Sequence, residues 1–234
     1  MELNERRMMK NRYLKNMNML NREENDRLKT FKVCVVGCGG LGGYVIEFLG
    51  RLGIGTITAV DGDVFDETNL NRQLLSTEEV LGKNKAFIAE VRMKQVNHEI
   101  RINPVQAFIG EENCDEIIKN HDIVVDALDS ITTRRLLEVH CEKLMIPLIH
   151  GAIAGWYGQV STILPGDRTL QKIYPPEEEN GAEKELGNPS FSPALVASIQ
   201  AAETLKVLLG RGEILHRKML TIDLLNQEYE IFYL

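Results

Sequence analysis

Residues 31–61 read FKVCVVGCGGLGGYVIEFLGRLGIGTITAVD, and this stretch decides the fold. Residues 31–37 form a short run rich in β-branched side chains, which is typical of a buried parallel strand. A glycine turn follows, and the pattern then predicts a helix over residues 41–52 and a second strand over residues 56–60. Strand, turn, helix and strand in this order form the repeating unit of a doubly wound α/β sheet.

The glycine turn satisfies the pattern Gly-x-Gly-x-x-Gly and predicts a nucleotide site. Gly37 permits the tight turn, Gly39 lets a phosphate approach the backbone, and Gly42 lets the helix pack close to the strand. Gly40 belongs to the same turn, at a helix start whose free N–H groups and partial positive charge favour phosphates. Asp61 ends the second strand, where its carboxylate can accept hydrogen bonds from ribose hydroxyls.

A loop of mixed charge follows the second strand and narrows the class of nucleotide. A dinucleotide-dependent dehydrogenase needs no arginine and lysine at this place. A site that holds the triphosphate of ATP does, because fixed cations stabilise the developing charge on the leaving phosphates. In this stretch Arg72 and Lys85 can supply these cations. It also contains Asp63, Asn69 and Gln73, which the family resemblance given below implies as further residues of the nucleotide site.

A second informative stretch reads HDIVVDALDS, residues 121–130. Residues 123–126 are expected to form a buried strand, so that Asp126 and Asp129 lie at its carboxyl end. Ligands of doubly wound sheets bind off the carboxyl ends of the strands, which makes Asp129 a candidate site residue. The alternative is that Asp129 only caps the helix expected over residues 131–144.

The rest of the chain continues the alternation of strands and helices. The helix over residues 131–144 is expected to turn Leu136, Leu137 and Val139 inward. Ser76 and Glu79 have the spacing of a capping box at a helix start. His150 ends a strand, where a histidine is more often packed than functional, so no role is assigned to it. Further helices are expected over residues 84–97, 114–120 and 192–209, and further strands over residues 102–107, 147–150, 151–164, 218–223 and 229–233.

These motifs at these spacings resemble the ubiquitin-activating-enzyme-like superfamily, with its ThiF, MoeB and HesA-type adenylyltransferases. The resemblance extends over residues 12–234 and is densest in residues 37–85 and 123–129. It implies ATP and Mg²⁺ as cofactors, with Arg72, Lys85 and Asp129 as catalytic residues and Asp129 as the Mg²⁺ ligand. It also implies a homodimer, in which Lys15 stands where relatives place an arginine that reaches the partner subunit's ATP.

The resemblance further implies a reaction. An ATP-dependent adenylyltransferase activates the C-terminal glycine of a small ubiquitin-like sulfur-carrier protein ending in Gly-Gly, and pyrophosphate leaves. Such activation serves sulfur transfer in the biosynthesis of a cofactor such as thiamine or molybdopterin. Three alternatives stay open: a relative acting on a non-protein substrate such as the threonylcarbamoyladenosine of transfer RNA, an NAD(P)-dependent oxidoreductase, and an inactive scaffold.

The composition bounds the fold class and the partners. The 234 residues suit a single α/β domain over residues 1–234, a doubly wound (Rossmann-like), mainly parallel sheet with a C-terminal, partly antiparallel extension. Residues 1–30 are expected to form a helical arm and residues 167–189 a mobile crossover loop. The net charge of −7 argues against binding to DNA. The chain has no apolar run long enough to cross a membrane and no signal peptide, so we expect it in the cytoplasm.

The four cysteines, Cys34, Cys38, Cys114 and Cys141, do not form any Cys-x-x-C pair. The common spacing of a structural zinc site is therefore absent, and no zinc is expected. Relatives can carry a cysteine in the crossover loop that forms a thioester with the carrier, but residues 167–189 contain none. We therefore expect the reaction to stop at the acyl-adenylate, with sulfur supplied by a separate donor.

Overall fold

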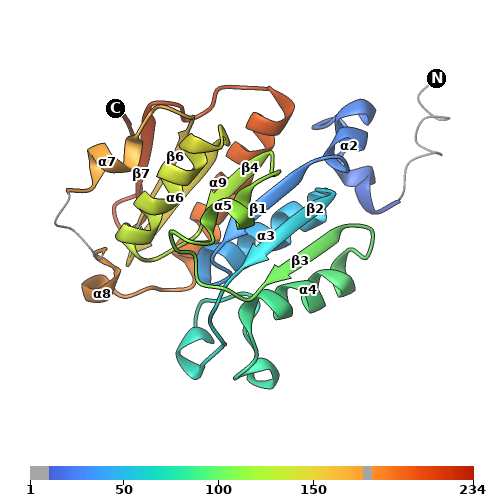
Figure 1. Ribbon diagram of the computed structural model, residues 1–234, viewed down its shortest axis with the longest axis horizontal. Coiled ribbons are helices and arrows are strands. Elements are labelled where there is room, and N and C mark those ends of the chain that lie inside the picture. Colours follow the sequence, from blue (N-terminus) through green and yellow to red (C-terminus); the bar gives the residue numbers. More distant parts are fainter. Residues whose placement is uncertain (1–10, 176–180) are drawn as a thin grey trace.

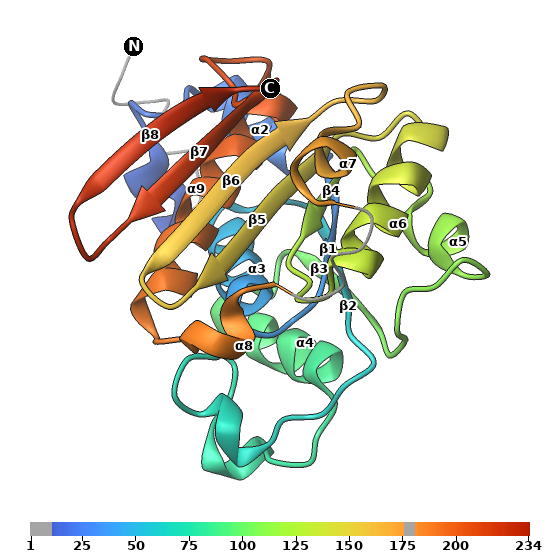
Figure 2. The same ribbon diagram turned by 90° about the vertical axis from the view of Figure 1, so that its left-hand side faces the viewer.

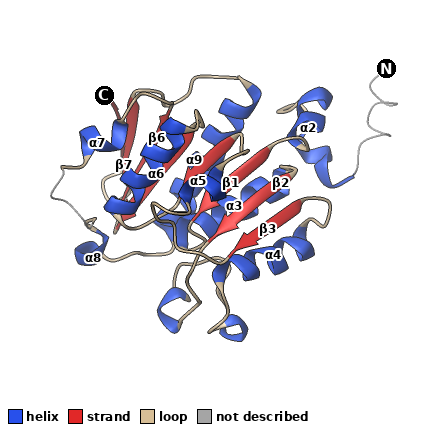
Figure 3. Ribbon diagram, in the orientation of Figure 1, coloured by secondary structure: helices blue, strands red, loops and turns tan. Residues whose placement is uncertain are grey.

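The computed structural model describes residues 11–175 and 181–234 and is built on one eight-stranded sheet (Figures 1 and 3). The strands are β1 (Lys32–Val36), β2 (Thr56–Val60), β3 (Arg101–Val105), β4 (Ile123–Asp126), β5 (Leu148–Ala154), β6 (Tyr157–Ile163), β7 (Lys218–Asp223) and β8 (Glu228–Tyr233). The α-helices are α2 (Arg22–Leu28), α3 (Gly40–Leu52), α4 (Lys85–Val96), α5 (Cys114–Ile118), α6 (Ile131–Lys143), α7 (Thr169–Ile173), α8 (Glu183–Leu186) and α9 (Phe191–Leu209). The 3₁₀ turns are η1 (Asn11–Asn16), η2 (Glu67–Asn69) and η3 (Glu78–Val80).

The strand order is β3-β2-β1-β4-β5-β6-β7-β8. The chain adds β2 and β3 on one side of β1, and after β3 it crosses to the other side of β1, where it adds β4 and the strands that follow. Strands β1 to β5 pair in parallel, whereas β6, β7 and β8 are each added antiparallel. The order 3-2-1-4-5 is that of a doubly wound sheet. The predicted fold class, with an antiparallel C-terminal extension, is confirmed.

Helices cover both faces of the sheet, and the two faces have separate hydrophobic cores. On one face, α3, α4 and α9 pack on a core that takes Val33 and Val35 from β1. On the other face, α5 and α6 lie over a core that takes Cys34 and Val36 from the same strand (Figure 1). Alternate side chains of a strand point to opposite faces, so a strand buried on both sides is apolar throughout.

The antiparallel part of the sheet extends beyond the helical layers. Figure 2 shows β5 to β8 side by side, with α9 behind them. Every residue of β8 is exposed, and so are its large apolar side chains, such as Ile231 and Tyr233. No helix within the described ranges is long and apolar enough to cross a membrane.

Several expected features differ in the structure. Ser76 does not cap a helix, because its Oγ donates to the carbonyls of Asn69 and Gln73, and only the short turn η3 follows. Val139 is 47% exposed, while Leu137 of the same helix is fully buried. The expected crossover loop holds α7 and α8, and residues 176–180 lie outside the described part. Of the expected N-terminal arm, residues 1–10 also lie outside it, and η1 and α2 account for the helical character of the rest.

Candidate functional site

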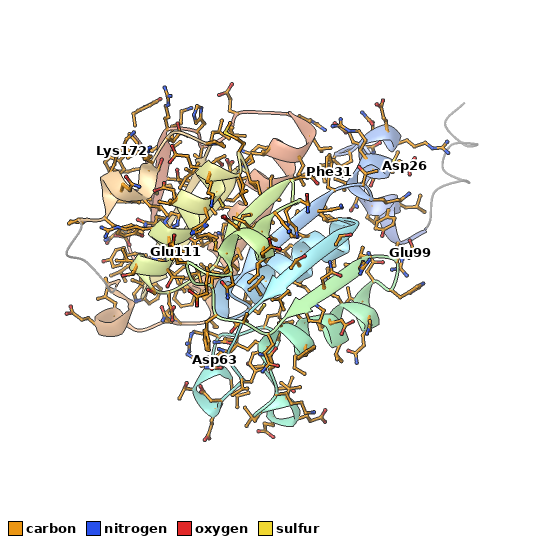
Figure 4. All side chains as sticks on the ribbon, in the orientation of Figure 1. Asp26, Phe31, Asp63, Glu99, Glu111 and Lys172 are labelled. Atoms are coloured by element: carbon orange, nitrogen blue, oxygen red, sulfur yellow. The ribbon has the colours of Figure 1, made fainter. Side chains whose placement is uncertain are left out.

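A cleft of about 260 Å³ lies at the carboxyl end of the parallel strands. Its walls come largely from the residues that follow β1, β2, β3 and β4. This is the expected place for a ligand site in a doubly wound sheet, because strands are added on opposite sides of β1 before and after this point. In Figure 4, Asp63 lies at this end, whereas Asp26, Phe31 and Glu99 lie at the opposite end. The predicted site residues that line the cleft are Gly37, Gly39, Gly40, Asp61, Asp63, Arg72, Gln73, Lys85 and Asp129.

The glycine turn is a backbone cradle that leaves no room for side chains at two of its positions. Gly37 has φ of +93°, and a Cβ there would lie 2.5 Å from the carbonyl oxygen of Ala127. A Cβ on Gly42 would lie 1.8 Å from the carbonyl oxygen of Gly37, so Gly42 packs beneath the turn and does not line the cleft. The turn therefore presents bare backbone to the cleft at the start of α3.

A buried polar atom faces this cradle. Gln73 is buried, and a Cβ on Gly39 would lie 3.4 Å from its Nε2. Its Oε1 has no hydrogen-bond partner among the described residues. Buried amide groups in folded proteins are normally paired, so an unpaired one in a cleft indicates a ligand. The amide Nε2 beside Gly39 can donate to a phosphate oxygen, and the unpaired Oε1 can accept from a hydroxyl of the ligand, so the cradle and this amide together fit a nucleotide.

Asp61 connects the glycine turn to the end of β2. Its Oδ2 accepts a hydrogen bond from the Cys38 backbone N–H at 2.8 Å, and its Oδ1 accepts one from the Asp63 N–H at 2.9 Å. Burial raises the pKa of the Asp61 carboxyl above its ordinary value, although both hydrogen bonds and the Lys85 ammonium act in the opposite direction. Each carboxylate oxygen keeps a further acceptor site, which a ribose hydroxyl can use.

Two of the cations that line the cleft, Lys85 and Arg72, were predicted from the sequence. The Lys85 side chain is buried, and its Nζ lies 2.9 Å from Asp63 Oδ2. This hydrogen bond holds the pKa of Asp63 below its usual range. Arg72 is half-buried, and its Nη1 donates to the Thr68 carbonyl and to Asn71 Oδ1, each at 2.9 Å. Both cations are therefore held in place by the loop before a ligand binds.

Asp129 is exposed at the end of β4 and lines the cleft. The alternative role as a helix cap belongs to its neighbour, because Ser130 Oγ accepts the hydrogen bond from the Thr133 N–H that caps α6. No hydrogen bond or ion pair of the Asp129 carboxylate is found within the described residues. A carboxylate without such partners, beside a phosphate cradle, is a fitting ligand for a hard cation such as Mg²⁺.

Two predicted site residues, Gly42 and Asn69, do not line the cleft. Gly42 packs beneath the glycine turn, and Asn69 belongs to the loop after β2. Asn69 is buried under the loop, where its Oδ1 accepts a hydrogen bond from the Asp66 N–H in the cap of η2. Its carbonyl also accepts from the Arg72 and Gln73 N–H groups. In this structure Asn69 shapes the loop that carries Arg72 and does not reach the cleft.

Of the lining residues that were not assigned from the sequence, three have polar or aromatic side chains. Arg134 reaches the cleft from α6, Phe108 from the segment after β3, and Asn188 from the segment before α9. The Asn188 carbonyl accepts a hydrogen bond from Asn71 Nδ2 at 3.0 Å, so two distant loops meet over the cleft. None of these three positions belongs to a motif that was assigned from the sequence.

A second cavity, of about 410 Å³, adjoins the cleft and has Arg134 and Ile153 in common with it. We call this second cavity the groove. Its floor is made by the strands β5 to β8, and residues Gly181 and Ala182 border it. The groove therefore extends from the cleft along the antiparallel strands of the sheet, which Figure 2 shows side by side.

None of the four cysteines lines the cleft or the groove, and all four are buried. All four are free, and none is more than 2% exposed. Burial raises the pKa of the Cys38 thiol well above its ordinary value, and that of Cys114 to about 12. Within the described residues, no group of three or more His, Cys, Asp or Glu side chains is placed to hold a metal ion.

Lys15 lies far from the cleft of its own chain. The neighbouring Asn16 contacts the carbonyl of Leu52 at the C-terminal end of α3, and Tyr13 packs on Gly53 just beyond it. The glycine turn is at the other end of this 13-residue helix, about 20 Å away at 1.5 Å per residue. Lys15 is therefore not placed to contact a nucleotide bound in its own chain.

Comparisons with known proteins agree with this architecture. The model of the ThiF family matches residues 12–234. The SAMP-activating enzyme E1 of Haloferax volcanii is 35% identical over 211 residues, which cover 89% of this chain and 78% of that protein. The sulfur carrier protein adenylyltransferase of Thermus thermophilus is 37% identical over 216 residues, covering 88% of this chain and 80% of that protein. The crystal structure of E. coli MccB with MccA-N7isoASN has the same fold, with a TM-score of 0.83 and 24% identity, and covers 97% of this chain and 72% of that one.

Proposed function

Because the chain belongs to the ThiF family, we propose that it is an ATP-dependent adenylyltransferase acting on a small ubiquitin-like sulfur-carrier protein. The substrate group is the carboxylate of a C-terminal Gly-Gly tail. The activated carrier then accepts sulfur from a separate donor, in the synthesis of a cofactor such as thiamine or molybdopterin. Members named as activating enzymes and adenylyltransferases support this activity.

The observation that carries the proposal is the connection between the cleft and the groove. ATP in the cleft places its phosphates on the glycine turn, near Arg72 and Lys85. A peptide tail lying in the groove brings its terminal carboxylate to the wall at Arg134, which both cavities share. Two glycines suit such a tail because they have no side chain that needs room beside Arg134 and Ile153, the residues that both cavities share.

The reaction needs positioning and charge neutralisation more than proton transfer. A carboxylate oxygen of the tail attacks the α-phosphorus, the bond from that phosphorus to the bridging oxygen breaks, and pyrophosphate leaves. The attacking group is already ionised, so no general base is required. Arg72 and Lys85 stabilise negative charge on the phosphates, and the fixed cleft supplies orientation. Asp129 would hold Mg²⁺, which supplies further neutralisation of the triphosphate when bound.

The experiment that tests the proposal is carrier-dependent exchange of labelled pyrophosphate into ATP. A carrier with its Gly-Gly terminus should support exchange, and the same carrier lacking the last glycine or carrying a C-terminal amide should not. If exchange does not depend on the carrier, the proposal that the substrate is a carrier protein is wrong. Saturable binding of a nicotinamide dinucleotide without any exchange would favour an oxidoreductase instead.

We propose that the protein has no structural zinc. The absence of Cys-x-x-C pairs supports this proposal, because structural zinc sites are usually built from such pairs. Elemental analysis is expected to find no stoichiometric zinc. A chelator should also leave the melting temperature unchanged, because only a protein that holds a structural metal ion loses stability when the ion is removed. One zinc per chain would contradict the prediction.

We propose that two copies of the chain form a symmetric dimer. Two-fold homodimers are the commonest oligomers. Lys15 lies far from the cleft of its own chain, so any contact that it makes with a nucleotide would be with one bound by a partner subunit. Light scattering at micromolar concentration should give twice the chain mass of 26.5 kDa. A monomer at that concentration would exclude both the dimer and a role for Lys15 in trans.

We predict that no covalent thioester forms between this protein and the carrier. A thioester requires an accessible thiolate, and the four thiols are buried and have raised pKa values, so they stay protonated. Enzyme, ATP, Mg²⁺ and carrier should give no carrier-sized shift on a gel without reductant. A shift that dithiothreitol removes, and that Cys38→Ala abolishes, would contradict this.

A further inference from the structure

A buried chain of hydrogen bonds connects the end of β4 to the segment after α7, and the reaction outlined above leaves it unused. It begins at Asp126, which is fully buried directly before the turn that carries Asp129. Asp126 Oδ1 accepts a hydrogen bond from the Leu128 N–H at 3.0 Å, and Oδ2 lies 2.7 Å from His150 Nδ1. His150, also fully buried, is the strand-end histidine to which no role was assigned.

The chain continues through the other ring nitrogen of His150. Its Nε2 lies 3.5 Å from the Tyr174 hydroxyl and 3.2 Å from Gln159 Nε2. Burial lowers the pKa of His150, so the ring is neutral and one nitrogen donates while the other accepts. With Nδ1–H donating to Asp126, Nε2 accepts from the Tyr174 O–H, and the Gln159 amide donates to the Tyr174 hydroxyl oxygen.

The Tyr174 hydroxyl also faces Arg134, the residue in the wall between the cleft and the groove. Arg134 Nη1 lies 3.5 Å from that hydroxyl, and its Nε donates to the Leu128 carbonyl at 3.0 Å. Its Nε also lies 3.8 Å from Asp126 Oδ2. The guanidinium is therefore held from one side by the turn after β4 and from the other by Tyr174, and it is only 4% exposed.

We propose that His150 and Tyr174 are positioning residues, which hold Arg134 where the substrate carboxylate meets the α-phosphate. This inference rests on the proposed function. A planar guanidinium can bind a carboxylate and a phosphate oxygen at once, but only in a fixed orientation. Tyr174 fixes that orientation from a segment that also borders the groove, so the enzyme aligns its cation on the same wall that receives the tail.

Tyr174→Phe tests the proposal, because it removes the hydroxyl alone. The kcat of carrier-dependent exchange should fall about 10-fold, as expected when a reacting group is slightly misplaced. The dissociation constant of ATP, the KM for the carrier and the melting temperature should stay within about twofold or a few degrees of wild type. Tyr233→Phe is the matched control, since Tyr233 is 81% exposed and lines neither cavity; its kinetics should not change.

A double-mutant cycle separates positioning from independent action. Arg134→Lys keeps the charge and loses the planar fork, and the double variant Arg134→Lys/Tyr174→Phe should be no slower than Arg134→Lys alone. His150→Asn retains a donor toward Asp126, removes the acceptor for Tyr174, and should match Tyr174→Phe in kcat.

Either of two results would overturn the inference while leaving the proposed function intact: wild-type kcat for Tyr174→Phe, or effects of Tyr174→Phe and Arg134→Lys that multiply. A wild-type protein that shows no exchange with any Gly-Gly carrier would overturn the proposed function and this inference together.

Discussion

Replacing Asp129 with alanine is expected to lower carrier-dependent ATP–pyrophosphate exchange by at least about 10²-fold, as is typical when a charge-stabilising group at the reacting phosphates is lost. The reason is the position of its carboxylate, which is exposed in the cleft without a hydrogen-bond partner among the described residues. Since Ser130 caps α6, removing Asp129 should not affect the helix. The melting temperature should therefore stay at its wild-type value.

A binding measurement shows whether the Asp129 carboxylate binds Mg²⁺ or only contributes negative charge to the cleft. Asp129→Ala should weaken the binding of ATP in the presence of Mg²⁺ and leave the binding of ATP with excess chelator unchanged or improved, because a negative charge is removed. Asp129→Asn should behave like the alanine variant, since a neutral amide is a poor substitute for the carboxylate. Near-wild-type exchange in a folded Asp129→Ala protein would remove this residue from the mechanism.

The sequence predicts correctly those strands whose local run of apolar, β-branched residues coincides with the part of the strand that is buried. The strands at residues 56–60 and 123–126 have the predicted bounds, because short apolar β-branched runs end there at a turn or an acidic residue. The expected strand at residues 147–150 continues to Ala154 and pairs with β6 as a hairpin. The predicted boundary between the strands over residues 147–150 and 151–164 is therefore wrong: the chain turns at Gly155 and Trp156, because pairing with β6 extends β5 through its glycine and alanine residues.

The residues that sequence reasoning missed reach the site through tertiary structure. Asn188 contacts the loop after β2 only because the segment before α9 crosses back over the cleft. Arg134 faces the cleft because of how α6 docks, which a helical pattern does not show. The error at Ser76 has the same origin: its hydroxyl is engaged by carbonyls of the preceding turn, and the spacing of a capping box carries no information about that competition.

Replacing Gly42 with alanine is expected to destabilise the protein by about 3 kcal/mol, the upper range for overpacking a tight site. An added Cβ would lie 1.8 Å from the Gly37 carbonyl oxygen and 3.3 Å from Ala127 Cβ. The first contact is with backbone, which cannot rotate away as a side chain would, so the turn itself must move. For a chain of this length the melting temperature should fall by roughly 10 °C, and ATP binding should weaken because the cradle loses its shape.

Gly40→Ala is the matched control for stability, since it lies two residues earlier in the same helix. A Cβ there would meet only Pro193, at 3.7 Å, which is an ordinary van der Waals distance. Alanine is favoured over glycine in a helix by up to about 1 kcal/mol, so this variant should be as stable as wild type or slightly more so. A melting temperature for Gly42→Ala that equals that of Gly40→Ala would show that the helix start can shift, and that close packing at Gly42 does not set the shape of the turn.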